Sequence, residues 1–227
     1  MIDVKFFFDA LQELNINNFS GVPDSLLKNI CSYISDNTSS TQHLISANEG
    51  SAVALAVGQY IATGKPSLVY MQNSGFGNTI NPLLSLADPK VYSIPMILMV
   101  GWRGEPGIKD EPQHIKQGAV MEQLLEACDI PFIIIDANTD NIKDILKSVV
   151  DKAVSNSQPV VLLVRKGTFK PYKLQNTLPD IAIESRENAI NMVVRASKKD
   201  DIFVSTTGMA SRELFEIRVK NKQSHKK

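Results

Sequence analysis

Short apolar runs that alternate with helical patterns constrain the fold of this chain most strongly. Four of these runs are apolar at nearly every position and are therefore typical of buried strands: 66–71, 94–102, 131–136 and 159–166. Strands that are apolar on both faces have to be covered on both faces, and strands joined by helices run parallel through right-handed crossovers. We therefore predict an α/β fold, with an open, mostly parallel sheet and helices on both faces.

The same alternation predicts the remaining elements and the domain organisation. Helices are expected at residues 4–16, 24–36, 49–64, 77–88, 119–128 and 141–154, and weaker strand patterns lie at 17–23 and 42–47. The pattern pauses between residues 167 and 180, a segment with two prolines, and restarts with a helix over 184–197, a strand over 201–206 and a further helix. Because one strand and two helices cannot build a core, we expect three parts: a first domain over 1–167, a linker over 168–183, and the incomplete start of a second domain over 184–227.

Composition excludes several classes of partner. The 24 basic and 24 acidic residues cancel, which argues against nucleic acid or an anionic membrane as the main partner.

Cys31 and Cys128 lack the spacing of a CxxC pair and lie in apolar helical patterns, so we expect buried, reduced thiols. The first residues contain an acid, Asp3, and no long apolar run, as expected for a cytoplasmic protein without a signal peptide or membrane anchor.

The loops that follow the strands are the candidate sites, since ligands of parallel sheets bind beyond the carboxyl ends of the strands. Four such loops are polar: GVPDS at 21–25, ANEGS at 47–51, MQNSGFGN at 71–78 and GWRGEPGIKDEPQH at 101–114. The first is also explained by an ordinary helix N-cap at Asp24 or Ser25, and the third by a plain glycine-rich turn. The long charged stretch over 101–118 suits an anionic substrate, but it equally fits a solvated loop.

One carboxylate, Glu49, opens the helix predicted over 49–64, which is apolar on almost every side. The helix dipole at this position favours the ionised group, whereas burial favours the protonated acid. Either a structural first-turn glutamate or a group that exchanges a hydrogen bond with a nitrogen base fits this pattern. His43 and His225 receive no role, and we find no cluster of residues at metal-ligand spacing.

The loops in this order, followed by STTGMASRELFE at 205–216, resemble the phosphonopyruvate decarboxylases, a family of thiamin-diphosphate enzymes. The NEG element and the glycine-rich loop are common to many thiamin-diphosphate enzymes, while GWRGEPGIKDEPQH is more particular to phosphonopyruvate and sulfopyruvate decarboxylases. The resemblance implies the pyrimidine-binding fold and a glutamate, here Glu49, that hydrogen-bonds the aminopyrimidine ring and thereby activates the cofactor.

Other roles follow from the resemblance position by position. Cofactor contacts are implied for Pro23, Glu49, Gln72, Asn73, Ser74 and Gly75, and substrate contacts for Asp24 and Ser25. Arg103, Lys109 and His114 are candidates for binding the phosphonate, because a dianionic group favours cationic donors.

The departure from the family is large. The Gly-Asp-Gly motif and later asparagine that hold Mg²⁺ and the diphosphate in related enzymes are not in this sequence, so we expect those ligands in a missing domain and assign no metal ligand here. The chain then carries about half of a site that two subunits usually share, as a homo-oligomer or with a separate diphosphate-domain chain. Three hypotheses stay open: the N-terminal part of a phosphonopyruvate decarboxylase, inactive alone; the α-type subunit of a sulfopyruvate decarboxylase; or a non-catalytic module that pairs with intact homologues.

Overall fold

The computed structural model describes residues 1–176, 184–198, 200–206 and 208–223. The chain divides into two compact units, Met1–Asn176 and Thr177–Lys227. The first contains the sheet and every loop singled out above, and the second contains two helices.

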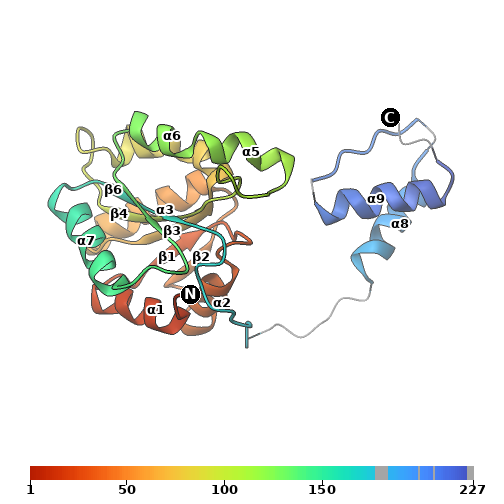
Figure 1. Ribbon diagram of the computed structural model, residues 1–227. Helices are drawn as coiled ribbons and strands as arrows, with labels where there is room; N and C mark the ends of the chain where they lie inside the picture. The colour runs from red at the N-terminus through yellow and green to blue at the C-terminus, as the bar shows by residue number, and fades with distance from the viewer. Residues whose placement is uncertain (177–183, 199, 207, 224–227) are drawn as a thin grey trace. The chain divides into compact units, whose positions relative to one another are not determined.

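The first unit is built on one six-stranded parallel sheet (Figure 1). The strands are β1 (Phe19–Gly21), β2 (His43–Ile45), β3 (Leu68–Gln72), β4 (Met96–Gly101), β5 (Phe132–Ile135) and β6 (Pro159–Val164), in the order β2-β1-β3-β4-β6-β5. All of the pairs are parallel. β4 and β6 are buried at every position, which explains their unbroken apolar runs. The predicted α/β fold is therefore confirmed.

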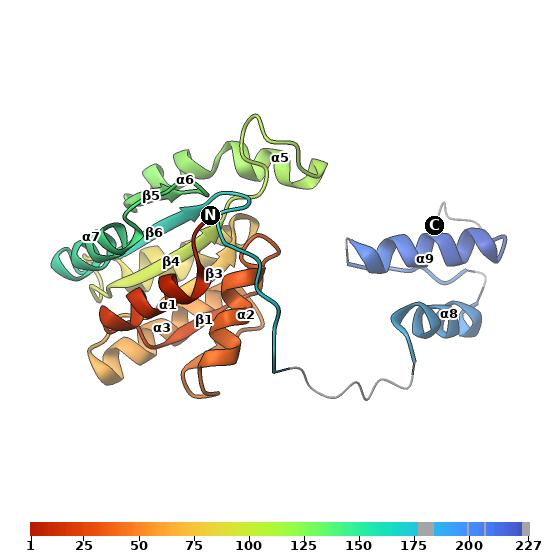
Figure 2. The ribbon, with the colours of Figure 1, turned by 60° about the horizontal axis from the view of Figure 1, so that its bottom comes forward.

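Helices cover both faces of this sheet (Figures 1 and 2). On one face lie α1 (Val4–Glu13), α2 (Lys28–Asn37) and α7 (Ile142–Ser155). The other face is covered by α3 (Glu49–Thr63), the 3-10 helix η1 (Asn73–Thr79), α4 (Ile80–Pro82), the π-helix η2 (Leu83–Ala87) and α6 (Met121–Ala127). Two buried apolar clusters, one on each side of the sheet, form the core.

The helices differ most from the predicted ones in three places. α2 begins at Lys28 with Leu27 as its N-cap, so an N-cap at Asp24 or Ser25 is wrong; the Asp24 side chain instead accepts a hydrogen bond from the backbone of Leu26. The stretch 101–118, predicted as a loop, contains most of the helix α5 (Pro112–Ala119), which has proline near its start, where the missing N–H costs nothing.

The third difference concerns the helix predicted over residues 77–88, which begins at Asn73 and passes through 3-10, α and π turns. Pro82 lies at the end of the α turn and has no N–H to donate, so regular α-helical bonding cannot continue through it. The glycine-rich segment 73–79 is consequently a tight helical turn that carries side chains at the carboxyl end of β3.

Residues 168–176, predicted to belong to the linker, pack on the first unit. Ile2 and Phe169 form a parallel bridge, and the Phe169 ring lies 5.0 Å from that of Phe7. The Tyr172 hydroxyl donates a hydrogen bond of 2.9 Å to Asp36. The rest of the predicted linker, residues 177–183, lies outside the described residues.

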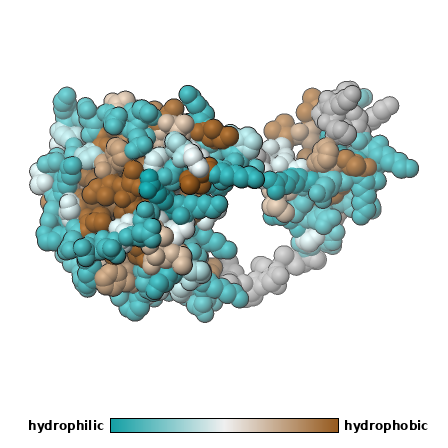
Figure 3. Space-filling view, in the orientation of Figure 1, coloured by the Kyte–Doolittle hydropathy of each residue, from teal (hydrophilic) through white to brown (hydrophobic). Residues whose placement is uncertain are grey.

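The second unit pairs α8 (Arg186–Ala196) with α9 (Met209–Lys220), and Arg186 binds Glu213 through two hydrogen bonds of 2.7 Å. The strand predicted at 201–206 is wrong: this segment has no strand structure, because no neighbouring strand among the described residues pairs with it. Ile202 and Val204 are 75% and 95% exposed. Figure 3 shows apolar residues at the surface of this unit.

Across the part of the chain that the structure describes, no helix is both long and apolar enough to cross a bilayer.

Candidate functional site

Hydrogen bonds connect the polar loops at the carboxyl edge of the sheet. The Asn73 side chain, which follows β3, binds both the N–H and the C=O of Arg103, which follows β4, at 3.0 and 2.8 Å. Arg103 in turn donates to the Ser25 hydroxyl at 2.9 Å. Asn78 donates to Glu49 at 2.8 Å, which connects the segment after β3 to the start of α3. The four loops expected to lie near one another are therefore in contact.

Glu49 lies half-buried in the first turn of α3. Asn48 is the N-cap and accepts a hydrogen bond of 2.9 Å from the Ser51 N–H, so Glu49 is not needed to cap the helix. Its Oε2 accepts from Asn78, while its Oε1 lies against Gly75, where an added Cβ would be only 2.2 Å away. Gly75 therefore leaves room for the carboxylate, and Oε1 has no hydrogen-bond partner within the described part of the chain.

The segment after β3 contributes amide and hydroxyl groups in different ways. Asn73 is 1% exposed, and its amide is occupied by the Arg103 backbone, so Asn73 positions the two loops. Gln72 donates to the Ser74 hydroxyl, and both of these side chains are half-buried at the edge of the sheet. Gln72 and Ser74 are thus less buried than Asn73, and they bond to each other and not to another loop.

Asp24 is a buried carboxyl group at this edge, 6% exposed. Its Oδ2 accepts from the Leu26 N–H at 2.9 Å and would lie 2.3 Å from a Cβ added at Gly101. Among the described residues, its Oδ1 has no partner. Burial raises the pKa of the Asp24 carboxyl, while backbone N–H groups and the Arg103 charge act in the opposite direction. The adjacent Pro23 and Ser25 are exposed.

Arg103 forms a partly buried ion pair with Asp110, whose side chains are 19% and 13% exposed. The guanidinium donates from Nε and from one terminal nitrogen, at 2.8 and 2.5 Å. Asp110 also accepts from the backbone N–H groups of Gly104 and Glu111, at 2.8 and 2.7 Å. These hydrogen bonds hold the pKa of Asp110 far below its usual range, and the bond from Arg103 has the largest effect. Asp110 in turn raises the pKa of Arg103. The pair fixes the fold of the loop after β4.

We expect Asp110→Asn to lower the free energy of unfolding at pH 7 by about 2 kcal/mol, the usual loss for hydrogen bonds to a charged group. Because the folded-state pKa of Asp110 is depressed, its contribution is complete above the unfolded pKa of about 4 and is lost as pH falls further. The difference between the variant and the parent, measured by urea unfolding, should therefore shrink below about pH 4. A difference that stayed constant down to pH 2 would contradict this account.

Lys109 and His114, the other two residues predicted to bind the phosphonate, lack an ion pair like that of Arg103 within the described residues. The Lys109 side chain is exposed and that of His114 is half-buried on α5, and neither makes an ion pair or side-chain hydrogen bond within the described residues. Sequence reasoning missed Asn78, the partner of Glu49, although it lies three residues after Gly75 in the glycine-rich segment.

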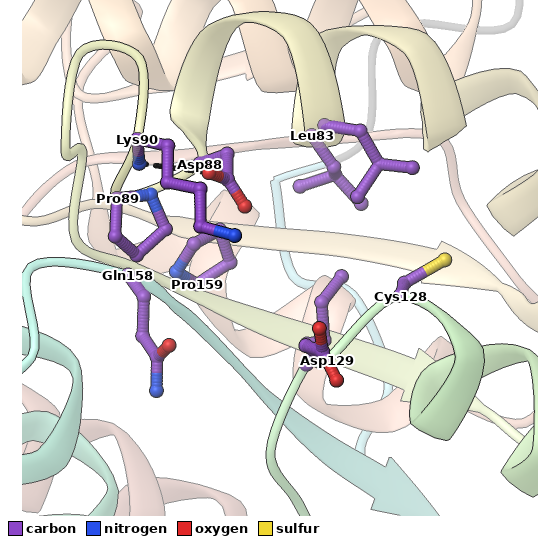
Figure 4. A pocket seen from close by; sticks show the side chains of 10 residues that line it. Leu83, Asp88, Pro89, Lys90, Cys128, Asp129, Gln158 and Pro159 are labelled. Atoms are coloured by element: carbon purple, nitrogen blue, oxygen red, sulfur yellow. Dashed lines mark hydrogen bonds between the residues drawn. The ribbon is translucent and has the colours of Figure 1, made fainter.

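A separate hollow lies at the opposite edge of the sheet (Figure 4). It is lined by residues before β4 and β5 and at the start of β6, including Asp88, Asp129 and Pro159. Asp88 there accepts a hydrogen bond of 2.8 Å from the Lys90 N–H, and Asp129 lies across the hollow from it in Figure 4. None of the predicted site residues lines it, so the candidate site remains the carboxyl edge.

Comparisons with known proteins identify the family. The model of the thiamine pyrophosphate enzyme N-terminal TPP-binding domain matches residues 4–125. A phosphonopyruvate decarboxylase of Streptomyces viridochromogenes is 30% identical over 232 residues, 96% of this chain and 57% of the relative. A sulfopyruvate decarboxylase subunit alpha of Methanocaldococcus jannaschii is 35% identical over 125 residues, 55% of this chain and 70% of the relative.

A solved structure agrees with the fold. Benzoylformate decarboxylase of Polynucleobacter necessarius superimposes with a TM-score of 0.54 at 20% identity, over 87% of this chain and 37% of that one. This chain spans little more than half, 57%, of the curated phosphonopyruvate decarboxylase from Streptomyces viridochromogenes. The chain belongs to the thiamine pyrophosphate enzyme family, and residues 4–125 match the N-terminal TPP-binding domain of that family.

Proposed function

We propose that this chain is the pyrimidine-binding part of a decarboxylase that converts 3-phosphonopyruvate to phosphonoacetaldehyde and CO₂, in phosphonate biosynthesis of the 2-aminoethylphosphonate type. The similarity to a phosphonopyruvate decarboxylase over 96% of the chain supports this choice. The observation that carries it is Glu49, which has one oxygen held by Asn78 and the other lying over Gly75 without a partner.

The residues around Glu49 fit the aminopyrimidine of thiamin diphosphate. A side chain at position 75 would occupy the space beside Oε1, so Gly75 keeps that oxygen accessible to a planar ring. In this proposal Oε1 exchanges a hydrogen bond with the ring nitrogen, and Asn78 fixes the carboxylate orientation. Pro23, Gln72 and Ser74 line the approach, while Asn73 acts through the loop it holds. The cofactor, when bound, supplies the electron sink for loss of CO₂.

The substrate in this proposal lies beside Asp24 and Ser25. Oδ1 of Asp24 is buried without a partner, so a proton held there would donate to an oxygen of the bound 2-oxo acid. Arg103 contributes mainly by positioning Ser25, since Asp110 already neutralises it. Lys109 and His114 remain candidates for binding the phosphonate.

The diphosphate half of the site lies outside the described sheet in this proposal. The sequence contains no Gly-Asp-Gly motif, so we assign Mg²⁺ and the diphosphate to a second domain that residues 184–227 begin, or to a partner chain. A homo-oligomer or a pair of different chains would complete the site. The chain alone should then show little or no activity.

A second candidate activity is the decarboxylation of sulfopyruvate. The 35% identity to a sulfopyruvate decarboxylase subunit alpha exceeds that to the phosphonopyruvate enzyme, although over a shorter stretch. The name of that relative also indicates that it works as a subunit of a larger enzyme. Phosphonate and sulfonate are both tetrahedral anions, so the two substrates have to be separated by experiment.

The experiment fuses residues 1–176 to the C-terminal half of the Streptomyces viridochromogenes relative and assays both substrates with thiamin diphosphate and Mg²⁺. We expect the fusion to release phosphonoacetaldehyde faster than sulfoacetaldehyde, and the isolated chain to release neither. The relative rebuilt at the same junction is the control. If that control is active and the fusion is inactive on both substrates, or if the isolated chain turns over alone, the proposal is wrong.

A further inference from the structure

A hollow of about 310 Å³ opens beside Asp24, between α2 and the ends of β1 and β2. Its wall includes Tyr70, which is fully buried and whose hydroxyl lies 2.7 Å from Nε2 of His43. Ser25, Lys28 and Ser32 provide polar groups along the turn before α2 and the first part of that helix. The hollow therefore combines a rigid wall with hydroxyl and ammonium donors.

Several of these polar groups have unused hydrogen-bonding capacity. Oδ1 of Asp24 is a buried atom without a partner among the described residues, and Asp24 as a whole is only 6% exposed. Lys28 takes part in none of the ion pairs found among the described residues. Leu27, the N-cap of the ten-residue helix α2, makes no side-chain hydrogen bond to the N–H groups of the first turn. Unpaired donors and a buried unpaired carboxyl in one hollow indicate a ligand.

We infer that this hollow binds the second anionic group of a short 2-oxo acid, and that Lys28, with the Ser25 and Ser32 hydroxyls and the start of α2, is the main determinant of that specificity. The inference rests on the proposed function, which it deepens by assigning the head group to residues other than Lys109 and His114. The ligand class is a 2-oxo acid with a phosphonate or sulfonate at its far end.

The position of the hollow connects it to the cofactor side of the site. Asp24 lines it and lies against Gly101, which pairs with Gln72 in the sheet. Gln72 leads directly into the segment with Gly75, which contacts Glu49. In this inference a 2-oxo acid beside Asp24 has its reacting end toward the segment with Gly75 and its far end toward Lys28.

The local charges favour an anion in this hollow. Ser25 accepts from Arg103, so its own hydrogen is available to donate into the hollow. Burial raises the pKa of the Asp24 carboxyl. The ionised group would repel an anion, whereas in the protonated group Oδ1 would be a donor. The dipole of α2 adds positive potential at the same end, close to the Lys28 ammonium.

The test measures binding of phosphonoacetate and sulfoacetate to the intact 227-residue chain by ¹H–¹⁵N NMR titration, without thiamin diphosphate. We expect saturable shifts of amides 25–32 with at least one probe, and about tenfold weaker binding in Lys28→Met but less than twofold in Lys109→Met. Lys28→Arg should retain most of the binding. The probe that binds more tightly identifies the head group.

Two controls separate this inference from the proposed function and from misfolding. Glu49→Gln should bind the probes as tightly as the parent, because the head-group site does not use the cofactor side. The thermal midpoint of Lys28→Met should stay within a few degrees of the parent, since Lys28 is exposed. Shifts confined to residues 103–116, equal binding in Lys28→Met, or no saturable shift with either probe would overturn the inference.

Discussion

Glu49→Gln should lower kcat of the two-domain fusion at least about 100-fold on its preferred substrate, the usual loss when a catalytic proton-transfer group is removed. Glutamine preserves the shape and accepts a hydrogen bond from Asn78, but its second position is an amide that cannot share a proton with a ring nitrogen. The loss should therefore appear in turnover, while the fold and the contacts of α3 remain. Single-turnover kinetics of the fusion measure this directly.

Glu122→Gln is the matched control for this prediction. Glu122 is also a half-buried glutamate in the first turn of a helix, α6, where it interacts with the same kind of helix dipole. If Glu49 were only a first-turn glutamate, the two substitutions would have similar small effects. An equal response of the two variants in both kcat and stability would remove the catalytic role from Glu49.

The fold could be predicted from the sequence because burial on both faces leaves a direct pattern in the residues. β4 and β6 are fully buried, and their apolar runs therefore give both the strands and the need for helices on each side. The boundaries of the helices could be predicted less well. α5 contains His114, Lys116 and other polar residues and buries only Gly118, so it lacks the apolar face by which a helix is found.

Site residues were predictable by location more than by role. The loops after β1, β2, β3 and β4, all of them recognised in the sequence, contribute polar groups that meet at the sheet edge. Sequence could not show that Arg103 would be held by Asp110, seven residues away, because that pairing depends on the path of the loop. The partnerless Oδ1 of Asp24 is likewise a consequence of tertiary burial.

Gly21 illustrates a constraint that composition alone does not reveal. It pairs with Tyr70 in the sheet, and a Cβ at this position would lie 2.2 Å from the Tyr70 carbonyl oxygen and 2.6 Å from its ring. Tyr70 cannot move aside easily, since it is fully buried and its hydroxyl is 2.7 Å from His43. Only glycine lets the ring pass under β1 toward β2.

Gly21→Ala should therefore lower the free energy of unfolding by about 3 kcal/mol, the upper part of the range for overpacking, because the closest clash is with backbone. Gly58→Ala is the matched control: Gly58 is exposed in α3 and an added Cβ meets no atom within 4 Å, so we expect a gain of about 0.5–1 kcal/mol. Urea unfolding measures the change in the free energy of unfolding for both variants. If steric contact at β1 decides the result, this change is negative for Gly21→Ala and positive for Gly58→Ala; if the loss of a flexible glycine decides it, the two changes have the same sign. A Gly21→Ala loss below about 1 kcal/mol would mean that β1 and Tyr70 separate at little cost, and the wall of the hollow beside Asp24 would then be too pliable to select a head group.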